Sequence, residues 1–339
     1  MLKIAIIGAG FMGQTHAKAY AGVTNCQLAA ICDTSESLRK DFSETYRCAA
    51  FANIDTLLNE CDFDVIDICL PTFLHEETVV KAASAKKDII CEKPFSLSVA
   101  SLDRMFNAVR ENQVRLCVGQ VLRFWQEYVD AHHSVRSGTL GSIRYAYAAR
   151  LSDHPKWSDW YRRAENSGGG LFDLHLHDID FMIWTFGRVK SVFAAGTKNE
   201  YGCWNHVNST LLFEEGTSAS VQGVLEMGAG YPFTMELRIV GTNKTYEYGM
   251  RAGDNLSNRD QALRATRIYE NGNVTVADQK PRDAYTVELE HFVQCLNEGH
   301  ESNVIPNAEV RDVLCTVEAL RDSLESGKLV TVNYDRREK

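Results

Sequence analysis

The sequence predicts an α/β domain with a parallel sheet, followed by an α+β domain that is built on one large, mostly antiparallel sheet. Over residues 1–122, short apolar runs alternate with segments of helical period, which is typical of strands joined by crossover helices. After residue 123 the chain changes to alternating segments with short connections, which favours antiparallel pairing. We therefore expect one domain at residues 1–122 and a second at 123–339.

Length and composition agree with two folded domains. The chain has 339 residues, of which 45% are hydrophobic and 24% charged, whereas single cores usually stop growing near about 250–300 residues. Its net charge of −9 argues against a nucleic-acid partner and against binding to an anionic membrane. The 10 cysteines are scattered without a C-x-x-C pair, which predicts free thiols. We expect a cytoplasmic protein with no secretory leader and no membrane-spanning segment.

The apolar runs of the first domain predict five strands separated by four helices. The strands are expected at residues 3–7, 27–32, 65–70, 89–91 and 116–118, and the helices at 13–20, 35–46, 74–85 and 98–112. Parallel sheets bind ligands at the carboxyl ends of their strands. The residues that directly follow each run are therefore the functional candidates.

In the second domain, strands are expected near residues 145–149, 208–213, 218–225, 233–240 and 329–333. Helices are expected at 126–137, 171–186, 284–297 and 308–326. An antiparallel sheet that is covered on one side leaves a second face open. This face predicts a homo-oligomer, a dimer or a tetramer, with a solvated polar face as the alternative.

The first functional motif is a glycine-rich turn after the first strand. Gly8, Gly10 and Gly13 have the spacing of a dinucleotide-binding turn. Gly8 can bend the chain, Gly10 lets the main chain approach a pyrophosphate, and Gly13 lets the following helix pack closely on its strand. Together with Phe11 and Met12 at the helix N-terminus, these glycines are predicted to bind the cofactor phosphates.

Asp33 ends the second predicted strand and lies 20 residues after Gly13. A carboxylate at this place can accept hydrogen bonds from the adenosine ribose, and it repels the additional phosphate of NADP. We therefore expect NAD as the cofactor, with NADP as the alternative. No arginine follows Asp33 before Arg39, so a partner for a 2′-phosphate is not evident. Another interpretation is that Asp33 only caps the helix that follows.

The triplet Glu92-Lys93-Pro94 ends the apolar run 89–91. Lys93 should thus lie at the carboxyl edge of the sheet, where the nicotinamide of a dinucleotide is expected. Pro94 ends the strand and restricts the local turn. A loop lysine is commonly only solvated, but this position in a nucleotide-binding fold favours a functional role.

Asp173 and His177 follow the glycine run 168–170 in the second domain. If residues 171–186 are helical, these two side chains share a face, whereas His175 is rotated by about 160° from His177. Two histidines separated in this way cannot bind one metal, so no metal site is predicted. His177 near a carboxylate suits a general base, and we expect the glycines to let a ligand approach the helix. A purely structural hydrogen-bonded pair is the alternative.

The glycine turn, the Glu92-Lys93-Pro94 triplet and the segment from Asp173 to His177 together resemble the Gfo/Idh/MocA oxidoreductases. The resemblance covers essentially the whole chain. Residues 71–75 resemble the nicotinamide-side loop of that family, and residues 118–124 resemble its crossover into the second domain. One departure is His175, which stands where many members have glycine. Its helical phase directs it away from His177, so its role is left open.

This resemblance implies a Rossmann domain and the reversible oxidation of a secondary alcohol on a sugar or an inositol-like cyclic polyol by NAD or NADP. In the implied reaction His177 removes the hydroxyl proton, Lys93 binds the same oxygen, and Asp173 orients the substrate or His177. A non-catalytic NAD(P)-binding sensor is the rival function, which the presence of all three catalytic residues disfavours.

The expected contacts are as follows. Cofactor contacts are predicted for Gly8, Gly10, Phe11, Met12, Gly13, Asp33, Pro71, Thr72, His75, Glu92, Lys93 and Gln120. Substrate contacts are predicted for Lys93, Arg123, Trp160, Asp173 and His177. The aromatic and basic segment 152–166, with Trp157 and Trp160, can either stack on a sugar ring or pack against the protein.

Overall fold

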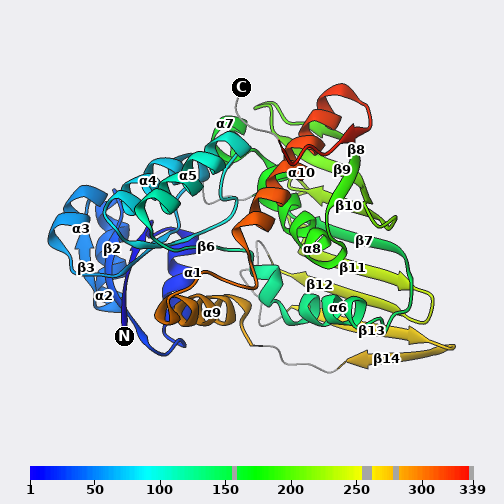
Figure 1. The fold of residues 1–339 in the computed structure, drawn as a ribbon, viewed down its shortest axis with the longest axis horizontal. Helices are drawn as coiled ribbons and strands as arrows, with labels where there is room; N and C mark the ends of the chain where they lie inside the picture. The colour runs from blue at the N-terminus through cyan, green and yellow to red at the C-terminus, as the bar shows by residue number, and fades with distance from the viewer. Residues whose placement is uncertain (155–158, 254–261, 278–281, 336–339) are drawn as a thin grey trace. The chain divides into compact units, whose positions relative to one another are not determined.

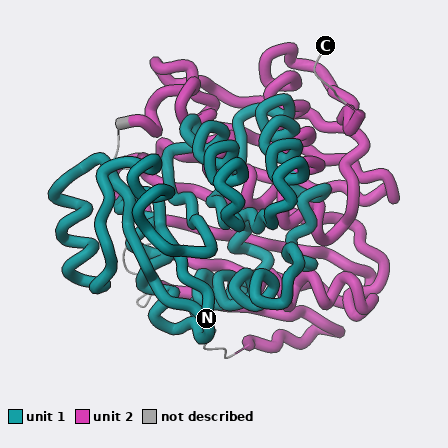
Figure 2. The backbone as a smooth tube through the Cα atoms, turned by 60° about the vertical axis from the view of Figure 1, so that its left-hand side comes forward, with its two compact units in different colours: residues 1–125, 281–310 teal, residues 126–280, 311–339 magenta. Residues whose placement is uncertain are grey.

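The chain passes twice through each of two structural units. The structure, a computed structural model, describes residues 1–154, 159–253, 262–277 and 282–335. Unit 1 contains Met1–Trp125 and Pro281–Val310, and unit 2 contains Gln126–Lys280 and Arg311–Lys339 (Figure 2). The prediction placed one boundary between residues 122 and 123. It did not include the return of the chain to unit 1 at residues 281–310.

Unit 1 is built on sheet A, a six-stranded sheet with the order β3-β2-β1-β4-β5-β6. All of its strand pairs are parallel. The strands are β1 (Leu2–Ile7), β2 (Cys26–Cys32), β3 (Ala49–Phe51), β4 (Val65–Ile68), β5 (Asp88–Cys91) and β6 (Leu116–Val118). The predicted parallel sheet is confirmed, and the strand order brings the carboxyl ends of β1, β4 and β5 to neighbouring places at one edge.

Helices cover both faces of sheet A. Figure 1 shows α4 and α5 on one face and α1 and α9 on the other. The helices of unit 1 are α1 (Phe11–Tyr20), α2 (Glu36–Tyr46), α3 (Ile54–Glu60), α4 (His75–Ser84), α5 (Val99–Asn112) and α9 (Ala284–Glu298). Because helices cover both faces, the stretches Ile4–Ile7 of β1 and Ile89–Cys91 of β5 are continuously apolar instead of alternating. The sequence analysis missed β3 and α3, which are short and have few buried residues to produce a periodic signal.

Unit 2 is built on sheet B, which has nine strands in the order β14-β13-β12-β11-β7-β10-β9-β8-β15. Every neighbouring pair is antiparallel except β7 and β10, which are parallel. The strands are β7 (Ile143–Leu151), β8 (Val189–Lys198), β9 (Trp204–Phe213), β10 (Ser218–Val224), β11 (Phe233–Gly241), β12 (Thr245–Ala252), β13 (Leu263–Glu270), β14 (Asn273–Ala277) and β15 (Val330–Thr331). The predicted large, mostly antiparallel sheet is confirmed.

The longer helices α6 (Gln126–Arg136), α8 (Leu176–Phe186) and α10 (Asn307–Ser326) lie along one face of sheet B (Figure 1). The Tyr246 hydroxyl on β12 donates to the Glu127 carbonyl of α6 at 2.7 Å. Ser323 of α10 accepts a hydrogen bond from the Ala194 N–H on β8 at 2.9 Å. Of the strands missed from the sequence, β8 has a register shift that interrupts its alternation, and β14 is almost wholly exposed.

None of the described helices has the length and apolar character that a membrane span requires.

A buried ion pair ties β7 to α8. The Arg150 guanidinium donates from Nε and Nη2 to the two carboxylate oxygens of Asp178, each at 3.0 Å. Burial alone would lower the pKa of Arg150, but the Asp178 carboxylate raises it above its ordinary value, so the guanidinium remains charged. Because Asp178 directly follows His177, this pair fixes the helix that carries His177.

We expect Asp178→Asn to lower the free energy of unfolding by about 3–5 kcal/mol, because it leaves the buried Arg150 cation without its carboxylate. Urea denaturation monitored by circular dichroism measures this loss. The matched control is Glu247→Gln, which breaks the surface ion pairs of Glu247 with Arg238 and Arg267 on the same sheet and should cost at most about 1 kcal/mol. Equal losses in the two variants would contradict the structural role of the buried pair.

Candidate active site

The three glycine positions of the turn between β1 and α1 differ in whether the protein itself requires glycine there. Gly8 has a φ of +100°, and a Cβ there would lie 2.6 Å from the Cys69 carbonyl oxygen. A Cβ on Gly13 would lie 1.9 Å from the Gly8 carbonyl oxygen, so the close packing of helix on strand requires glycine. Gly10, in contrast, has a φ of −72° and a Cβ there would meet nothing within 4 Å. The protein itself gives no reason for glycine at position 10, which fits a ligand that occupies this space.

The N-terminus of α1 is suited to an anion. Its N-cap is Gly10, which has no side chain to cap the helix, and no acidic residue lies in the first turn. The N–H groups of the first turn and the positive end of the helix dipole therefore favour a phosphate. Phe11 and Met12 begin this turn, two residues before the predicted start of the helix at residue 13. Together with the open space at Gly10, this end of α1 fits the pyrophosphate of a dinucleotide.

Asp33 lies beside the glycine turn, at the carboxyl end of β2. Its Oδ2 accepts from the Ala9 N–H and its Oδ1 accepts from the Ser35 N–H, both at 2.7 Å. The N-cap of α2 is Ser35, whose side chain accepts from the Leu38 N–H, so Asp33 is not the capping residue of this helix. The Arg39 guanidinium donates to the Asp33 carbonyl at 2.7 Å. The sequence analysis did not predict this contact, because the two residues are six positions apart.

The segment after β4 contains Pro71, Thr72 and His75. Pro71 precedes the 3-10 turn Thr72–Leu74, and Thr72 is buried. His75 is also buried, with Nε2 2.9 Å from the Leu70 carbonyl oxygen and Nδ1 3.3 Å from the Phe95 carbonyl oxygen. Burial lowers the pKa of His75, so its ring is neutral. The neutral ring lies between the segments after β4 and β5 and can donate to one of these two carbonyls. The cofactor contact of His75 stays a prediction.

The Glu92-Lys93-Pro94 triplet begins directly after β5. The Lys93 side chain is half-buried, and the Lys93–Pro94 peptide bond is cis. Glu92 is 5% exposed, its Oε2 accepts from the Lys93 main-chain N–H at 3.0 Å, and its Oε1 lies 2.9 Å from His16 Nε2. The cofactor contact of Glu92 also stays a prediction. Its carboxylate is directed into the protein, where it holds Lys93.

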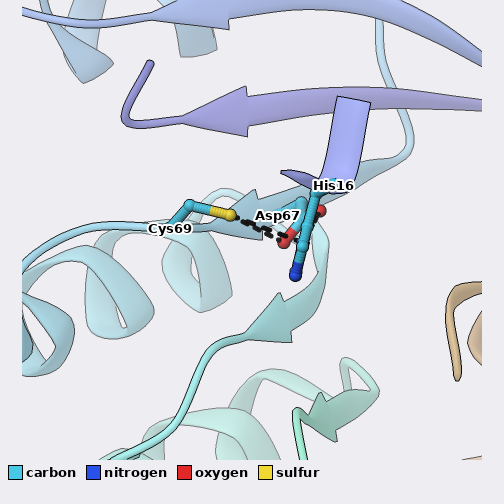
Figure 3. A group of neighbouring side chains, drawn as sticks. All are labelled: His16, Asp67 and Cys69. Carbon is cyan, nitrogen blue, oxygen red and sulfur yellow. Dashed lines mark hydrogen bonds and ion pairs between the residues drawn. The ribbon is translucent and has the colours of Figure 1, made fainter. Parts of the chain in front are cut away.

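Behind this edge lies a buried polar cluster that the sequence analysis missed (Figure 3). His16 Nδ1 lies 2.8 Å from Asp67 Oδ2, and the Tyr20 hydroxyl donates to the same oxygen at 2.8 Å. Cys69 Sγ lies 3.4 Å from His16 Nδ1. One signal was present in the sequence: Asp67 is the only charged residue of the buried strand β4, and a carboxylate there requires a partner.

His16, Asp67 and Cys69 each offer an atom with metal-ligating chemistry, and the three atoms lie within 4.8 Å of one another. Both ring nitrogens of His16, however, already face carboxylate oxygens. Burial raises the pKa of the Cys69 thiol to about 12, so the sulfur is not a thiolate at neutral pH. The donor set therefore fits a hydrogen-bonded cluster better than a metal centre.

Gln120 and Arg123 follow β6 and are both buried. The Gln120 main-chain N–H donates to Glu288 Oε1 of α9 at 2.7 Å. Arg123 donates from Nη1 to the Val304 carbonyl at 2.9 Å and pairs with Glu309. The Arg123 side chain is 0% exposed and bonds to residues 181 and 186 positions later in the chain, all within unit 1, and its substrate contact stays a prediction.

In unit 2, Asp173 belongs to a π-helical turn, Leu171–His175, and His177 lies in the first turn of α8. Asp173 is 9% exposed and His177 is half-buried. The predicted helix is thus present, with its first turn widened. Turns of this kind are rare and are found frequently at functional sites.

The glycine run before this turn is required by the packing of the chain itself. Gly168 and Gly169 have φ values of +72° and +68°. A Cβ on Gly168 would lie 2.5 Å from the Phe172 ring, and one on Gly169 would lie 2.6 Å from Cys203 Cβ. Their conformation and these close contacts explain the glycines within the chain, and the approach of a ligand to this helix stays a prediction.

His175 faces sheet B. Its Nε2 lies 2.9 Å from the Ser209 hydroxyl, which itself lies within donating distance of the Val221 carbonyl, at 3.3 Å. Burial lowers the pKa of His175 to about 3, so the ring is neutral. A Cβ on Gly223 would lie 2.7 Å from its Nδ1. His175 therefore anchors the π-helical turn in a space that only glycine at position 223 leaves free.

Trp160 stacks on Tyr161 with 3.9 Å between the ring centroids. Both side chains are half-buried, so an aromatic surface remains at this place. Trp157 lies outside the described residues. The substrate contact of Trp160 stays a prediction, as do the contacts of Lys93, Asp173 and His177, which are divided between the units: Lys93 in unit 1, and the other two in unit 2.

Comparison with known proteins agrees with this geometry. Residues 2–120 match the sequence profile of an oxidoreductase family with an NAD-binding Rossmann fold, and residues 128–247 match the GFO/IDH/MocA C-terminal domain. The chain is 28% identical over 313 residues to an uncharacterized oxidoreductase, YrbE, of Bacillus subtilis, covering 88% of this chain and 87% of the relative. It is 26% identical over 337 residues to the myo-inositol 2-dehydrogenase of Thermotoga maritima, covering 97% and 98%.

Among solved structures, an oxidoreductase from Agrobacterium radiobacter in complex with NAD+, L-tartaric acid and magnesium has a similar fold. The TM-score is 0.84 at 20% sequence identity, and the superposition covers 98% of each chain.

The different environments of Gly10 and Gly13 lead to a test of the cofactor site. We expect Gly10→Ala to weaken NAD binding while the melting temperature stays equal or rises, because alanine fits the backbone there and stabilises by about 0.4–1 kcal/mol through the unfolded state. Gly13→Ala should instead lower the free energy of unfolding by about 1–3 kcal/mol, since its methyl group clashes with main chain. Calorimetric titration with NAD and thermal unfolding measure both effects. Unchanged NAD binding in Gly10→Ala would contradict the assignment.

Proposed function

Because the chain belongs to the Gfo/Idh/MocA oxidoreductase family, with an NAD-binding Rossmann domain, we propose that it oxidises a secondary alcohol of a sugar or cyclic polyol. The observation that carries this proposal is the position of Lys93. It follows β5 at the carboxyl edge of sheet A, the edge that also contains Gly8 after β1 and Asp33 after β2. In parallel sheets this edge is where a dinucleotide and the group that reacts with it are bound.

The proposed step divides the work among three side chains. His177 takes the hydroxyl proton as a general base, and Lys93 hydrogen-bonds the same oxygen while it gains negative charge. Asp173, in the turn before His177, orients the substrate or the imidazole. The bound cofactor supplies the acceptor for the hydride that leaves the carbinol carbon. The alcohol thereby loses one proton and one hydride and becomes a carbonyl group.

A ring-shaped polyol such as an inositol is the substrate class that we propose first. The name of the myo-inositol 2-dehydrogenase relative supports this class, at 26% identity over 97% of the chain. The stacked pair of Trp160 and Tyr161 supports it as well, because aromatic faces bind the apolar face of a sugar ring.

NAD is the proposed physiological cofactor. The Asp33 carboxylate is held by two main-chain N–H groups beside the glycine turn, where it disfavours the 2′-phosphate of NADP. Arg39 is the feature that favours NADP, since its guanidinium lies on the main chain of Asp33. Comparison of the two cofactors at equal substrate concentration decides between them.

We also propose that the face of sheet B opposite its helices forms a homo-oligomer contact. Tyr145, Phe193 and Leu212 are large hydrophobic residues on this face, with exposed fractions of 37%, 42% and 38%. Exposed apolar groups gathered on one sheet face are typical of subunit interfaces. Sedimentation that finds only monomer at micromolar concentration would exclude this contact.

The catalytic assignment predicts that His177→Ala lowers kcat by about 10²–10⁴-fold, which is the usual contribution of a general base. NAD binding should be unchanged, because His177 is not part of the Rossmann domain. NADH absorbance with myo-inositol and a panel of sugars measures turnover, and His133→Gln, an exposed histidine of α6, is the control. Binding of NAD by the wild type without turnover of any polyol would favour the sensor function instead.

A further inference from the structure

His16 is a buried cation between two carboxylates. It is 1% exposed and lies on α1, three residues after Gly13. Its Nδ1 lies 2.8 Å from Asp67 Oδ2 and its Nε2 lies 2.9 Å from Glu92 Oε1. A neutral imidazole has one N–H and can donate to only one of these oxygens. The ring therefore carries both protons and bonds to both carboxylates.

The charges around His16 support this protonation. Burial is the largest single influence on the pKa of His16 and lowers it, but Asp67 and Cys69 together raise the pKa well above its ordinary value. Burial raises the pKa of Glu288, on α9, well above its ordinary value, and the negative Glu92 adds to the effect, so Glu288 is neutral. Among the described residues, Cys69, which is a thiol, Tyr20, which donates to Asp67, and Tyr285 of α9, whose ring centroid lies 6.2 Å from that of His16, also face the ring. One cation thus lies between two anions.

Glu92 transmits the position of His16 to Lys93. One carboxylate oxygen of Glu92 faces His16, and the other accepts from the Lys93 main-chain N–H at 3.0 Å. A carboxylate that is held at both oxygens has a fixed orientation, and it therefore fixes the main chain where the Lys93 side chain begins. Without the bond to His16, Glu92 would be a buried anion that is held at one oxygen only.

From this chain of contacts we propose that His16 is a positioning residue for Lys93, acting through Glu92, and that it joins the helix after the glycine turn to the segment that carries Lys93. This inference rests on the proposed catalytic function of Lys93. The Asp67 bond supports the ring from the other side, and Figure 3 shows Asp67 and Cys69 directed toward His16. The hydrogen bond to Glu92 controls the position of Lys93 and therefore catalysis. The hydrogen bond to Asp67 contributes only to stability.

The contact of His16 with Asp67 and its contact with Glu92 can be removed separately. Asparagine places its amide nitrogen near the position of Nδ1, and glutamine places it near the position of Nε2. His16→Asn therefore retains the bond to Asp67 and loses the bond to Glu92, whereas His16→Gln does the opposite. Tyr20→Phe, which removes only a hydrogen bond to Asp67, is the control for loss of stability without loss of positioning.

We expect His16→Asn to lower kcat by about 100-fold, the usual effect of a misplacement of roughly 1 Å in a catalytic group. The KM for the polyol and the Kd for NAD should change much less than kcat, by roughly threefold, because the bond from Lys93 strengthens as the alcohol oxygen gains negative charge. His16→Gln and Tyr20→Phe should retain kcat within the same range, although both lose thermal stability. Equal kcat losses in His16→Asn and His16→Gln would overturn the proposal. If His16 had only a structural role, loss of the bond to Asp67 and loss of the bond to Glu92 would affect kcat alike.

A second readout does not depend on turnover. Hydrogen exchange of the Lys93 amide, measured by NMR on the full-length protein with NAD, reports the bond to Glu92 directly. We expect this amide to be protected in the wild type and in His16→Gln, and to exchange at least about tenfold faster in His16→Asn. If no polyol is oxidised, the proposed function fails while this measurement still tests the positioning. Unchanged protection in His16→Asn would overturn the positioning whatever the substrate is.

Discussion

The cofactor edge of unit 1 depends on the contact of one buried imidazolium with two carboxylates. His16, Asp67 and Glu92 come from α1, β4 and the segment after β5, which approach one another only after sheet A has formed. Burial of any one of these charges alone would cost several kcal/mol, and the three together compensate one another. Correct pairing of β1 with β4 and of β4 with β5 is therefore coupled to the placement of Lys93. The same contacts of His16 with Asp67 and Glu92 thus support both the fold of unit 1 and the proposed catalytic position of Lys93.

The sequence predicted those features whose physical reason is local. The glycine turn, the strand that ends at Asp33 and the strand that ends at Lys93 are each contained in a few consecutive residues, so periodicity and turn chemistry were sufficient. The internal partners of Arg123, His75 and Glu92 were not predicted, for the opposite reason. Each is a polar residue close to a predicted ligand edge, but its partner lies elsewhere in the chain: Glu309 for Arg123, Phe95 for His75 and His16 for Glu92. Without a partner in view, a polar side chain at such an edge is easily interpreted as a ligand contact.

Unit 2 shows the same limit in its glycines. The run 168–170 resembled a place where a ligand approaches, yet Phe172, Cys203 and Asn205 explain it within the chain. The reverse holds for Gly223, which no motif marked and which leaves the space for His175 some 48 positions earlier. The π-helical turn that contains Asp173 is held by this pair of distant residues and by the ion pair of Arg150 with Asp178. Local sequence indicates that a helix begins here, whereas the widened turn depends on contacts with β7, β9 and β10.

Residues whose identity is explained by contacts within the protein can be separated from residues for which the protein offers no such contact. The first support the site, and the second are candidates for ligand binding. Gly13 and Gly168 are explained by atoms of the chain itself, and so are Glu92 and Arg123, whose charges are answered by buried partners. Gly10 is not explained in this way, because the space beside it is open. Among the residues of the cofactor edge, the strongest candidate for ligand contact is thus the one for which the protein gives no reason, and the residues with complete internal partners are those that hold it in place. In the proposed reaction, the position of Lys93 thus depends on the buried His16 as well as on the residues that contact the substrate.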